Sequence, residues 1–134
     1  MNFARYFTRG LNNTLKLLNG LNFSYKGPWV TVTNDTVIDE WYVGDFNGAD
    51  YTLSIDHSNG EKELVRCLLV AGPDIANVVV YGRVNLNGNL ITLSASVNNS
   101  KVQLIANPAR SLPGPGSKVI FSANYYQTLN DLQR

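Results

Sequence analysis

The sequence has few charged residues and few of the side chains that most catalytic and metal sites use. Only 16% of its 134 residues are charged, against about 25% in an average soluble domain. It contains one cysteine and one histidine, which excludes a disulfide within the chain and a four-ligand zinc site of the usual kind. The surface is therefore expected to be mostly neutral and polar, which suits a chain whose faces are covered by partners.

Several binding classes also lack their usual signals. Eleven basic and ten acidic side chains give a net charge of +1, which provides no overall attraction for nucleic acid. No glycine-rich nucleotide motif occurs, no apolar run reaches the length of about 18 residues that a membrane span needs, and the N-terminus does not read as a secretory signal. We therefore expect no cofactor, no nucleic acid partner and no membrane partner.

The sequence offers little for catalysis. His57 lies in the turn DHSNGE, and we interpret it as an exposed imidazole without a visible partner. Seven acidic residues keep a carboxylate pair for glycoside hydrolysis open as an alternative, but we interpret them as surface and turn residues. These are Asp39, Glu40, Asp45, Asp50, Asp56, Glu61 and Glu63. The prediction is that the chain has no catalytic residues and is not an enzyme, with a small glycan hydrolase as a remote alternative.

Residues 2–19 are predicted to form an amphipathic helix. One side carries apolar side chains at helical spacing, and the other is basic and polar without any acid. Gly10 and the asparagines are poor helix formers, so the helix needs a docking surface, either the chain's own sheet or a neighbouring subunit. We divide the chain into an N-terminal helical anchor segment, 1–26, and a β-domain, 27–134. The candidate partner-binding residues of the anchor are Phe3, Phe7, Leu11, Leu15, Arg5 and Arg9.

From residue 29 onward, apolar and polar residues alternate with the period of β-strands. We predict eight strands, at 29–33, 36–43, 49–56, 62–71, 76–84, 89–97, 101–107 and 117–126. One apolar and one polar face is typical of antiparallel sheets. The fold class is therefore mainly β, an antiparallel β-sandwich of jelly-roll or immunoglobulin-like type preceded by the N-terminal helix, with a small barrel as the alternative.

The connections carry residues typical of turns. SNGE at 58–61 and LNGN at 86–89 contain the Asn-Gly pair that favours a type I′ hairpin, VNNSK at 97–101 predicts a further hairpin, and 107–117 is a longer loop. DFNGAD at 45–50 places several oxygen ligands together, but it departs from the calcium-loop pattern at three positions. We interpret Asn47-Gly48 as a tight hairpin turn, with a weak cation near Asp45 only if a neighbouring loop or subunit supplies more ligands.

The aromatic residues suggest partner contacts. In the pairs Trp41-Tyr42 and Tyr125-Tyr126, successive side chains point to opposite faces of a strand, so one of each pair faces away from the core. We include Trp41 and Tyr126 among the candidate partner-binding residues, and an exposed set of Trp and Tyr side chains would also suit a host-surface glycan. Cys67 lies in an apolar run and is interpreted as a buried, inert thiol.

The strands YTLSID, KELVRCLLVA and VVVYGRV and the closing SANYYQT carry a resemblance that covers about residues 49–130. This stretch resembles a β-rich module of virion structural proteins of tailed bacteriophages, particularly those infecting marine cyanobacteria. The resemblance implies a non-enzymatic virion component, either a capsid decoration or a part of the tail and its fibres. It also implies other virion proteins as partners, and we expect a homo-oligomer or many copies per particle. The alternative function is a carbohydrate-binding β-sandwich.

Overall fold

The computed structural model describes residues 23–128, and this part of the chain consists of nine β-strands joined by turns and loops, with no helix. The prediction of a mainly β, antiparallel fold is confirmed, whereas the predicted helix at 2–19 lies outside the described residues. The strands are β1 (Phe23–Lys26), β2 (Val30–Thr31), β3 (Thr36–Tyr42), β4 (Phe46–Asp56), β5 (Lys62–Ala71), β6 (Ala76–Asn85), β7 (Ile91–Asn98), β8 (Lys101–Pro108) and β9 (Lys118–Gln127).

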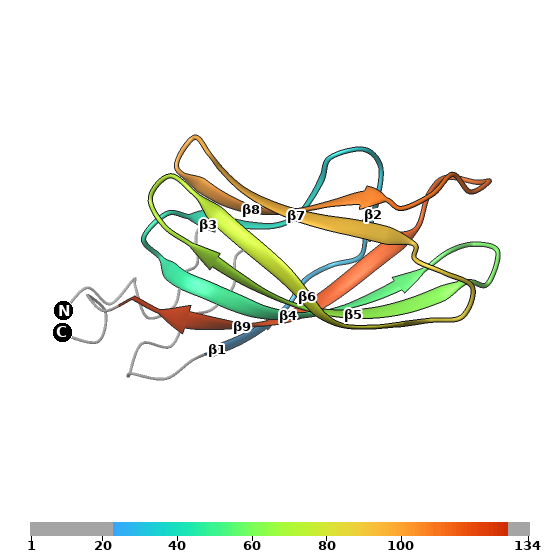
Figure 1. Ribbon diagram of the computed structural model, residues 1–134, viewed down its shortest axis with the longest axis horizontal. Helices are drawn as coiled ribbons and strands as arrows, with labels where there is room; N and C mark the ends of the chain where they lie inside the picture. Colours follow the sequence, from blue (N-terminus) through green and yellow to red (C-terminus); the bar gives the residue numbers. More distant parts are fainter. Residues whose placement is uncertain (1–22, 129–134) are drawn as a thin grey trace.

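The strands form two antiparallel sheets that lie one above the other (Figure 1). The larger sheet has the order β1-β9-β4-β5-β6, with β2 pairing to β9, and the smaller has the order β3-β8-β7. In the smaller sheet of an immunoglobulin constant-type domain, the third strand (C) pairs with F, which is the first strand of the F–G hairpin. Here β3 pairs with β8, which is the second strand of the β7–β8 hairpin. The strand order therefore does not establish the immunoglobulin-like type, and the jelly-roll type remains a prediction.

The core fills the space between the two sheets. The inner faces of β4, β5 and β9 contribute alternate residues, and β3, β7 and β8 contribute the opposing ones. The largest fully buried side chains are Trp41, Tyr51, Tyr125, Phe46, Leu53, Ile55, Leu90, Ile91, Leu104, Val32 and Val65. Phe46 stacks on Tyr125 with 4.8 Å between ring centroids and meets the edge of Trp41 at 5.4 Å, so aromatic rings join strands of both sheets.

The larger sheet begins earlier than the sequence-based boundary at residue 27. Phe23–Lys26 pairs with β9 in antiparallel register, from Phe23 opposite Tyr125 to Lys26 opposite Ser122. The predicted helical anchor segment included these four residues, but they belong to the β-structure. A short strand at the edge of a sheet leaves too few alternating residues for the period to be recognised in the sequence.

The turn that was predicted at Asn47-Gly48 of DFNGAD lies four residues earlier, at Val43-Gly44. Asn47 and Gly48 are inside β4, at a bulge in its pairing with β9, and the chain turns instead at Val43-Gly44, where Gly44 has φ of 93° and the Asp45 amide donates to the Tyr42 carbonyl. A Cβ atom at Gly48 would lie 2.1 Å from the carbonyl oxygen of Leu69. The glycine is therefore needed for the close approach of β4 and β5 rather than for a turn.

The chain forms hairpins at 58–61 and 97–101, as predicted, whereas the hairpin predicted at 86–89 was wrong, because this segment connects β6 to β7 of the other sheet. The predicted turn type was also wrong. Only the glycine of each Asn-Gly pair has positive φ, 92° at Gly60 and 118° at Gly88, whereas a type I′ turn needs positive φ at both central residues. The type I′ geometry occurs in the hairpin between β7 and β8, where Asn99 and Ser100 have φ of 52° and 63°. Asparagine tolerates this region better than most residues, which explains its position there.

Cys67 is fully buried on the inner face of β5, which confirms the interpretation of an enclosed thiol. Burial, together with a smaller contribution from the nearby Asp50 carboxylate, raises the pKa of this thiol to about 12. In the unfolded chain the thiol ionises near pH 9, so the stability that the neutral thiol contributes is fully present below that pH and is lost as the pH rises toward 12.

We therefore expect an alkaline loss of stability that depends on Cys67. Between pH 9 and 10.5 the free energy of unfolding should fall by about 2 kcal/mol more in the wild type than in Cys67→Ala, because one pH unit corresponds to about 1.4 kcal/mol for one proton. Urea unfolding at a series of pH values measures both proteins. Parallel pH profiles for the two proteins would contradict the expectation.

Candidate functional site

An apolar strip covers the outer face of β5 and β6, the two strands at one end of the larger sheet. Leu64 pairs with Val84 and Leu68 pairs with Val79 across the two strands, and all four side chains point away from the core. Val70 and Tyr81 complete the surface on the strands, and Ile75 and Leu86 lie in the adjoining turns. The eight residues that define the apolar strip, Leu64, Leu68, Val70, Ile75, Val79, Tyr81, Val84 and Leu86, are between 45% and 70% exposed.

The apolar strip departs from the usual division of an antiparallel sheet into a buried and a wet face. On the neighbouring β4, the outward residues are polar and include Asp50, Thr52, Ser54 and Asp56. β5 and β6 instead carry apolar residues on both faces. Apolar residues on both faces are expected for strands that are covered on both sides, so the sequence of these strands favours a partner over the outer face.

The apolar strip is large enough for a protein contact. With eight side chains about half exposed, it presents on the order of 600 Å² of surface, the upper end of the range for the largest patch on a monomer. Covering it would contribute about 15 kcal/mol at ~25 cal/mol per Å², against about 4–15 kcal/mol lost on association. The free energy gained by burying the apolar strip therefore matches or exceeds the cost of association, provided that the partner fits the surface well.

A small polar cluster lies in the middle of the apolar strip. The Tyr81 hydroxyl donates to Asp50 Oδ1 at 2.7 Å, Arg66 Nη2 pairs with Asp50 Oδ2 at 3.3 Å, and the guanidinium lies over the Tyr81 ring at 5.2 Å. The hydrogen bond to Asp50 raises the pKa of Tyr81. These contacts fix the ring before any partner binds, and they neutralise the charge on Arg66.

Other charges beside the apolar strip are also paired. Lys62 and Asp56 form an ion pair at 3.3 Å on the adjoining strands β5 and β4. Each charged side chain on the outer face of β4 and β5 thus has an opposite charge next to it. A neutral, apolar partner surface fits this face better than a strongly charged one.

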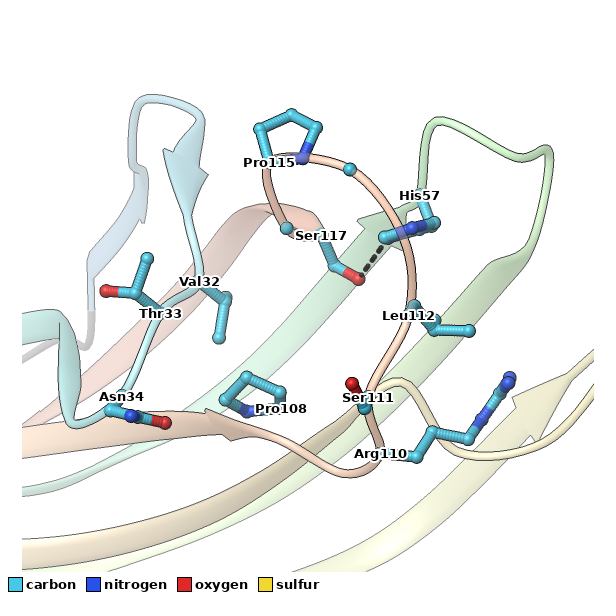
Figure 2. Close-up of a pocket in the computed structure, with 12 residues that line it drawn as sticks. Val32, Thr33, Asn34, His57, Pro108, Arg110, Ser111, Leu112, Pro115 and Ser117 are labelled. Carbon is cyan, nitrogen blue, oxygen red and sulfur yellow. Dashed lines mark hydrogen bonds between the residues drawn. The ribbon is translucent and has the colours of Figure 1, made fainter.

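A second feature is the pocket under the loop between β8 and β9 (Figure 2). It has a volume of about 270 Å³ and is lined by Val32, Thr33, Asn34, His57 and residues of the loop from Pro108 to Ser117. Gly116 has φ of 111°, and a Cβ atom there would lie 2.7 Å from the Val32 carbonyl oxygen, so the loop passes this point only with glycine.

His57 is buried beside this pocket, and the interpretation of an exposed turn imidazole was wrong. Nε2 lies 2.8 Å from the Pro113 carbonyl oxygen and Nδ1 lies 3.0 Å from Ser117 Oγ. Since a carbonyl only accepts, Nε2 carries the proton, and in the neutral ring Nδ1 accepts from the Ser117 hydroxyl. Sequence distance concealed both partners, because they lie in a loop more than fifty residues away.

The hydrogen bond between His57 and Ser117 resembles the histidine–serine contact of a catalytic triad. The third member of a triad is a carboxylate, however, and here a backbone carbonyl orients the imidazole instead. The Ser117 hydroxyl is also buried. Both hydrogen bonds tie the loop to the turn after β4, and Arg110 adds a contact to Glu61 and a hydrogen bond to the Asn89 carbonyl at 3.2 Å. Hydrogen bonds from Arg110 and Asn59 lower the pKa of Glu61. The arrangement supports a role in holding the loop.

The two candidate partner-binding residues that lie in the described part of the chain differ in exposure. Trp41 is 1% exposed and packs in the core, so its assignment as a partner-binding residue was wrong, whereas Tyr126 is 40% exposed on the outer face of β9. The prediction that the members of each aromatic pair face opposite ways is confirmed, because Tyr42 and Tyr126 are exposed and Trp41 and Tyr125 are buried. Phe3, Phe7, Leu11, Leu15, Arg5 and Arg9 lie outside the described residues.

Two of the carboxylates that were interpreted as surface residues are buried. Asp39 and Glu63 are 1% and 2% exposed, and each accepts hydrogen bonds from residues of other strands. Asp50, one of the oxygen ligands in DFNGAD, uses both carboxylate oxygens for Tyr81 and Arg66. Among residues 23–128 no three His, Cys, Asp or Glu side chains gather as a metal site, and no helix in this range is long and apolar enough to cross a membrane.

Comparisons with known proteins find similarity to solved structures alone, at low sequence identity. No protein-family model and no curated protein matches the sequence. Among solved structures, the tailspike protein of Acinetobacter baumannii phage AM24 aligns with 81% of this chain at 11% identity and a TM-score of 0.47. The tailspike protein of Acinetobacter phage vB_ApiP_P1 aligns with 78% at 10% identity and a TM-score of 0.40. The alignments cover only 26% and 21% of those proteins, and both phages infect Acinetobacter rather than cyanobacteria.

Proposed function

We propose that this chain is a structural component of a tailed-phage virion that acts by packing against another virion protein. The observation that carries the proposal is the apolar strip, a face of two strands whose exposed leucine and valine side chains have no role in the chain's own core. The sequence resemblance to virion modules, in particular those of phages of marine cyanobacteria, supports the same function. It includes the two strands that form the apolar strip.

Particles of the phage that encodes the chain provide the test. Mass spectrometry of purified particles should find the chain at a fixed copy number. Hundreds of copies would indicate a capsid-surface position, and a small multiple of three or six would indicate the tail or its fibres. Absence of the chain from purified particles would refute the proposal.

A pair of matched variants tests the surface itself. Leu68→Asp places a charge in the apolar strip and should reduce incorporation into particles at least about tenfold, because a buried unpaired charge is costly. Tyr42→Asp is the control, since Tyr42 is similarly exposed but lies on β3 of the smaller sheet. Equal incorporation of the two variants would show that the apolar strip is not the contact surface.

The glycan-binding alternative receives less support from the arrangement of the aromatic residues. Four exposed aromatic side chains lie apart in the fold: Trp29 precedes β2, Tyr42 is on β3, Tyr81 is on β6 and Tyr126 is on β9. Trp41 is in the core and offers no stacking surface to a sugar. A glycan array with Trp29→Ala and Tyr126→Ala therefore tests this alternative, and strong binding that either substitution abolishes would favour it.

A further inference from the structure

We infer that the apolar strip packs face to face against the apolar strip of a second copy of this chain. The inference names the partner of the surface on which the proposed function rests. The two sheets would be related by a two-fold axis that lies midway between the facing sheets. The axis runs parallel to β5 and β6, above the line that separates these two strands. Isologous contacts of this kind are the commonest in homo-oligomers, and they require a surface that is complementary to itself.

The pairing register of β5 and β6 provides this self-complementarity. Along the two strands, Leu64 lies opposite Val84, Arg66 lies opposite Gly82, and Leu68 lies opposite Val79. Rotation about the axis places the partner's β5 over β6 and the partner's β6 over β5, and each residue keeps its height along the strand direction. Leu64 then meets the partner's Val84 and Leu68 meets the partner's Val79, so apolar side chains contact apolar side chains in both directions.

Gly82 resolves the one difficulty of this packing, which is the position of Arg66 in the middle of the surface. Arg66 is opposite Gly82 in the pairing of β5 with β6, so the rotation places it over the partner's Gly82, where no side chain fills the space. Its charge is already balanced by Asp50, and its guanidinium rests on Tyr81. An axis perpendicular to the strands would instead bring Arg66 against the partner's Arg66, where like charges repel.

Area and charge also match a second copy. The apolar strip presents on the order of 600 Å², and polar atoms at its rim raise the contact toward the roughly 800 Å² per partner of a stable interface. The charges beside it are paired within the chain, which leaves both facing surfaces neutral. A strongly charged partner would gain no complementary charge from this face, whereas a second copy brings the same neutral, apolar surface.

The first test is the oligomeric state of the full chain, measured by sedimentation velocity over a range of concentrations. We expect a dimer in the wild type, a dimer in Tyr42→Asp, and a dissociation constant raised at least ~100-fold in Leu68→Asp. A wild-type chain that stays monomeric over the whole range overturns the inference, as does a dimer that Leu68→Asp leaves intact. If the chain is monomeric but Leu68→Asp still lowers incorporation into particles, the proposed function stands and only the identity of the partner fails.

The second test determines the register with a bismaleimide that reaches about 10 Å, the spacing of packed sheets. Leu68→Cys mixed with Val79→Cys should give a dimer in which position 68 is linked to position 79. Leu68→Cys mixed with Leu64→Cys should give no link between positions 68 and 64, because the axis leaves these positions about 13 Å apart along the strands. The axis also brings position 68 near its own equivalent in the partner, so peptide mapping of the products identifies which positions are joined. The buried Cys67 does not compete for the reagent in the folded protein. A link between positions 68 and 64 without a link between positions 68 and 79 overturns the proposed axis.

Discussion

Glu63→Ala is expected to lower the free energy of unfolding by about 4 kcal/mol, more than we expect for any other single substitution in this chain. Glu63 lies on the inner face of β5 and is 2% exposed. Its Oε2 accepts from Arg83 at 2.7 Å and from Asn85 at 3.1 Å, and its Oε1 accepts from the Leu90 amide at 3.0 Å. Alanine would leave Arg83 without its counter-ion and backbone amides without an acceptor at the start of β7.

Thermal unfolding followed by circular dichroism measures this loss, which corresponds to a fall in Tm of roughly 12 °C for a domain of this size. Glu63→Gln keeps one acceptor oxygen and should lose about half as much. Lys62→Ala is the matched surface control, because its ion pair with Asp56 is exposed and should contribute under about 1 kcal/mol. A Glu63→Ala protein as stable as Lys62→Ala would show that Glu63 is not the link between β5 and the β6–β7 connection.

Asp39→Ala should cost about 3 kcal/mol, for a related reason in the centre of the core. Asp39 Oδ2 accepts from the Tyr51 hydroxyl at 2.9 Å and from the Tyr125 hydroxyl at 2.7 Å. Asp39 belongs to β3 in the smaller sheet, and the two tyrosines belong to β4 and β9 in the larger one. The substitution removes a hydrogen-bonded link between the sheets and deprives two buried hydroxyls of this acceptor.

A double-mutant cycle with Tyr125→Phe separates the hydrogen bond from the lost volume. In the wild-type background Tyr125→Phe should cost about 1 kcal/mol, and in the Asp39→Ala background it should cost nothing or stabilise, because the acceptor is already gone. Urea unfolding of the four proteins provides the comparison. Additive costs would mean that the two groups do not interact.

The sequence was sufficient for most strands, because alternation with period two is visible without knowledge of distant contacts. It was not sufficient where a residue's surroundings are formed by distant segments. Asp39 lies on the same face of β3 as Trp41, and a carboxylate at that position did not look like a residue of the inner face. Its burial is stabilised by hydrogen bonds from Tyr51 and Tyr125, which belong to distant strands. His57 was misjudged in the same way, because Pro113 and Ser117 come from another loop.

The apolar strip was visible in the sequence but was not recognised. In KELVRCLLVA, leucine and valine occupy the positions where strict alternation would place polar residues, and ANVVVYGRV has a similar continuous run. The alternation in YTLSID, one strand earlier, set the expectation of a wet outer face for the whole sheet. Departure from alternation in two neighbouring strands was therefore the signal for the candidate surface.

The position of β9 has a consequence for synthesis of the protein on the ribosome. β9 is the last strand along the described chain, yet it lies between β1 and β4 inside the larger sheet. Until residues 118–127 emerge, β4 keeps an open edge and Phe23–Lys26 has no strand to pair with. A chain that lacks β9 therefore exposes the edge of β4 that β9 covers in the folded protein. Aggregation during translation should depend on how quickly the final strand becomes available, so a translational pause just before residue 118 would lower the yield of soluble protein.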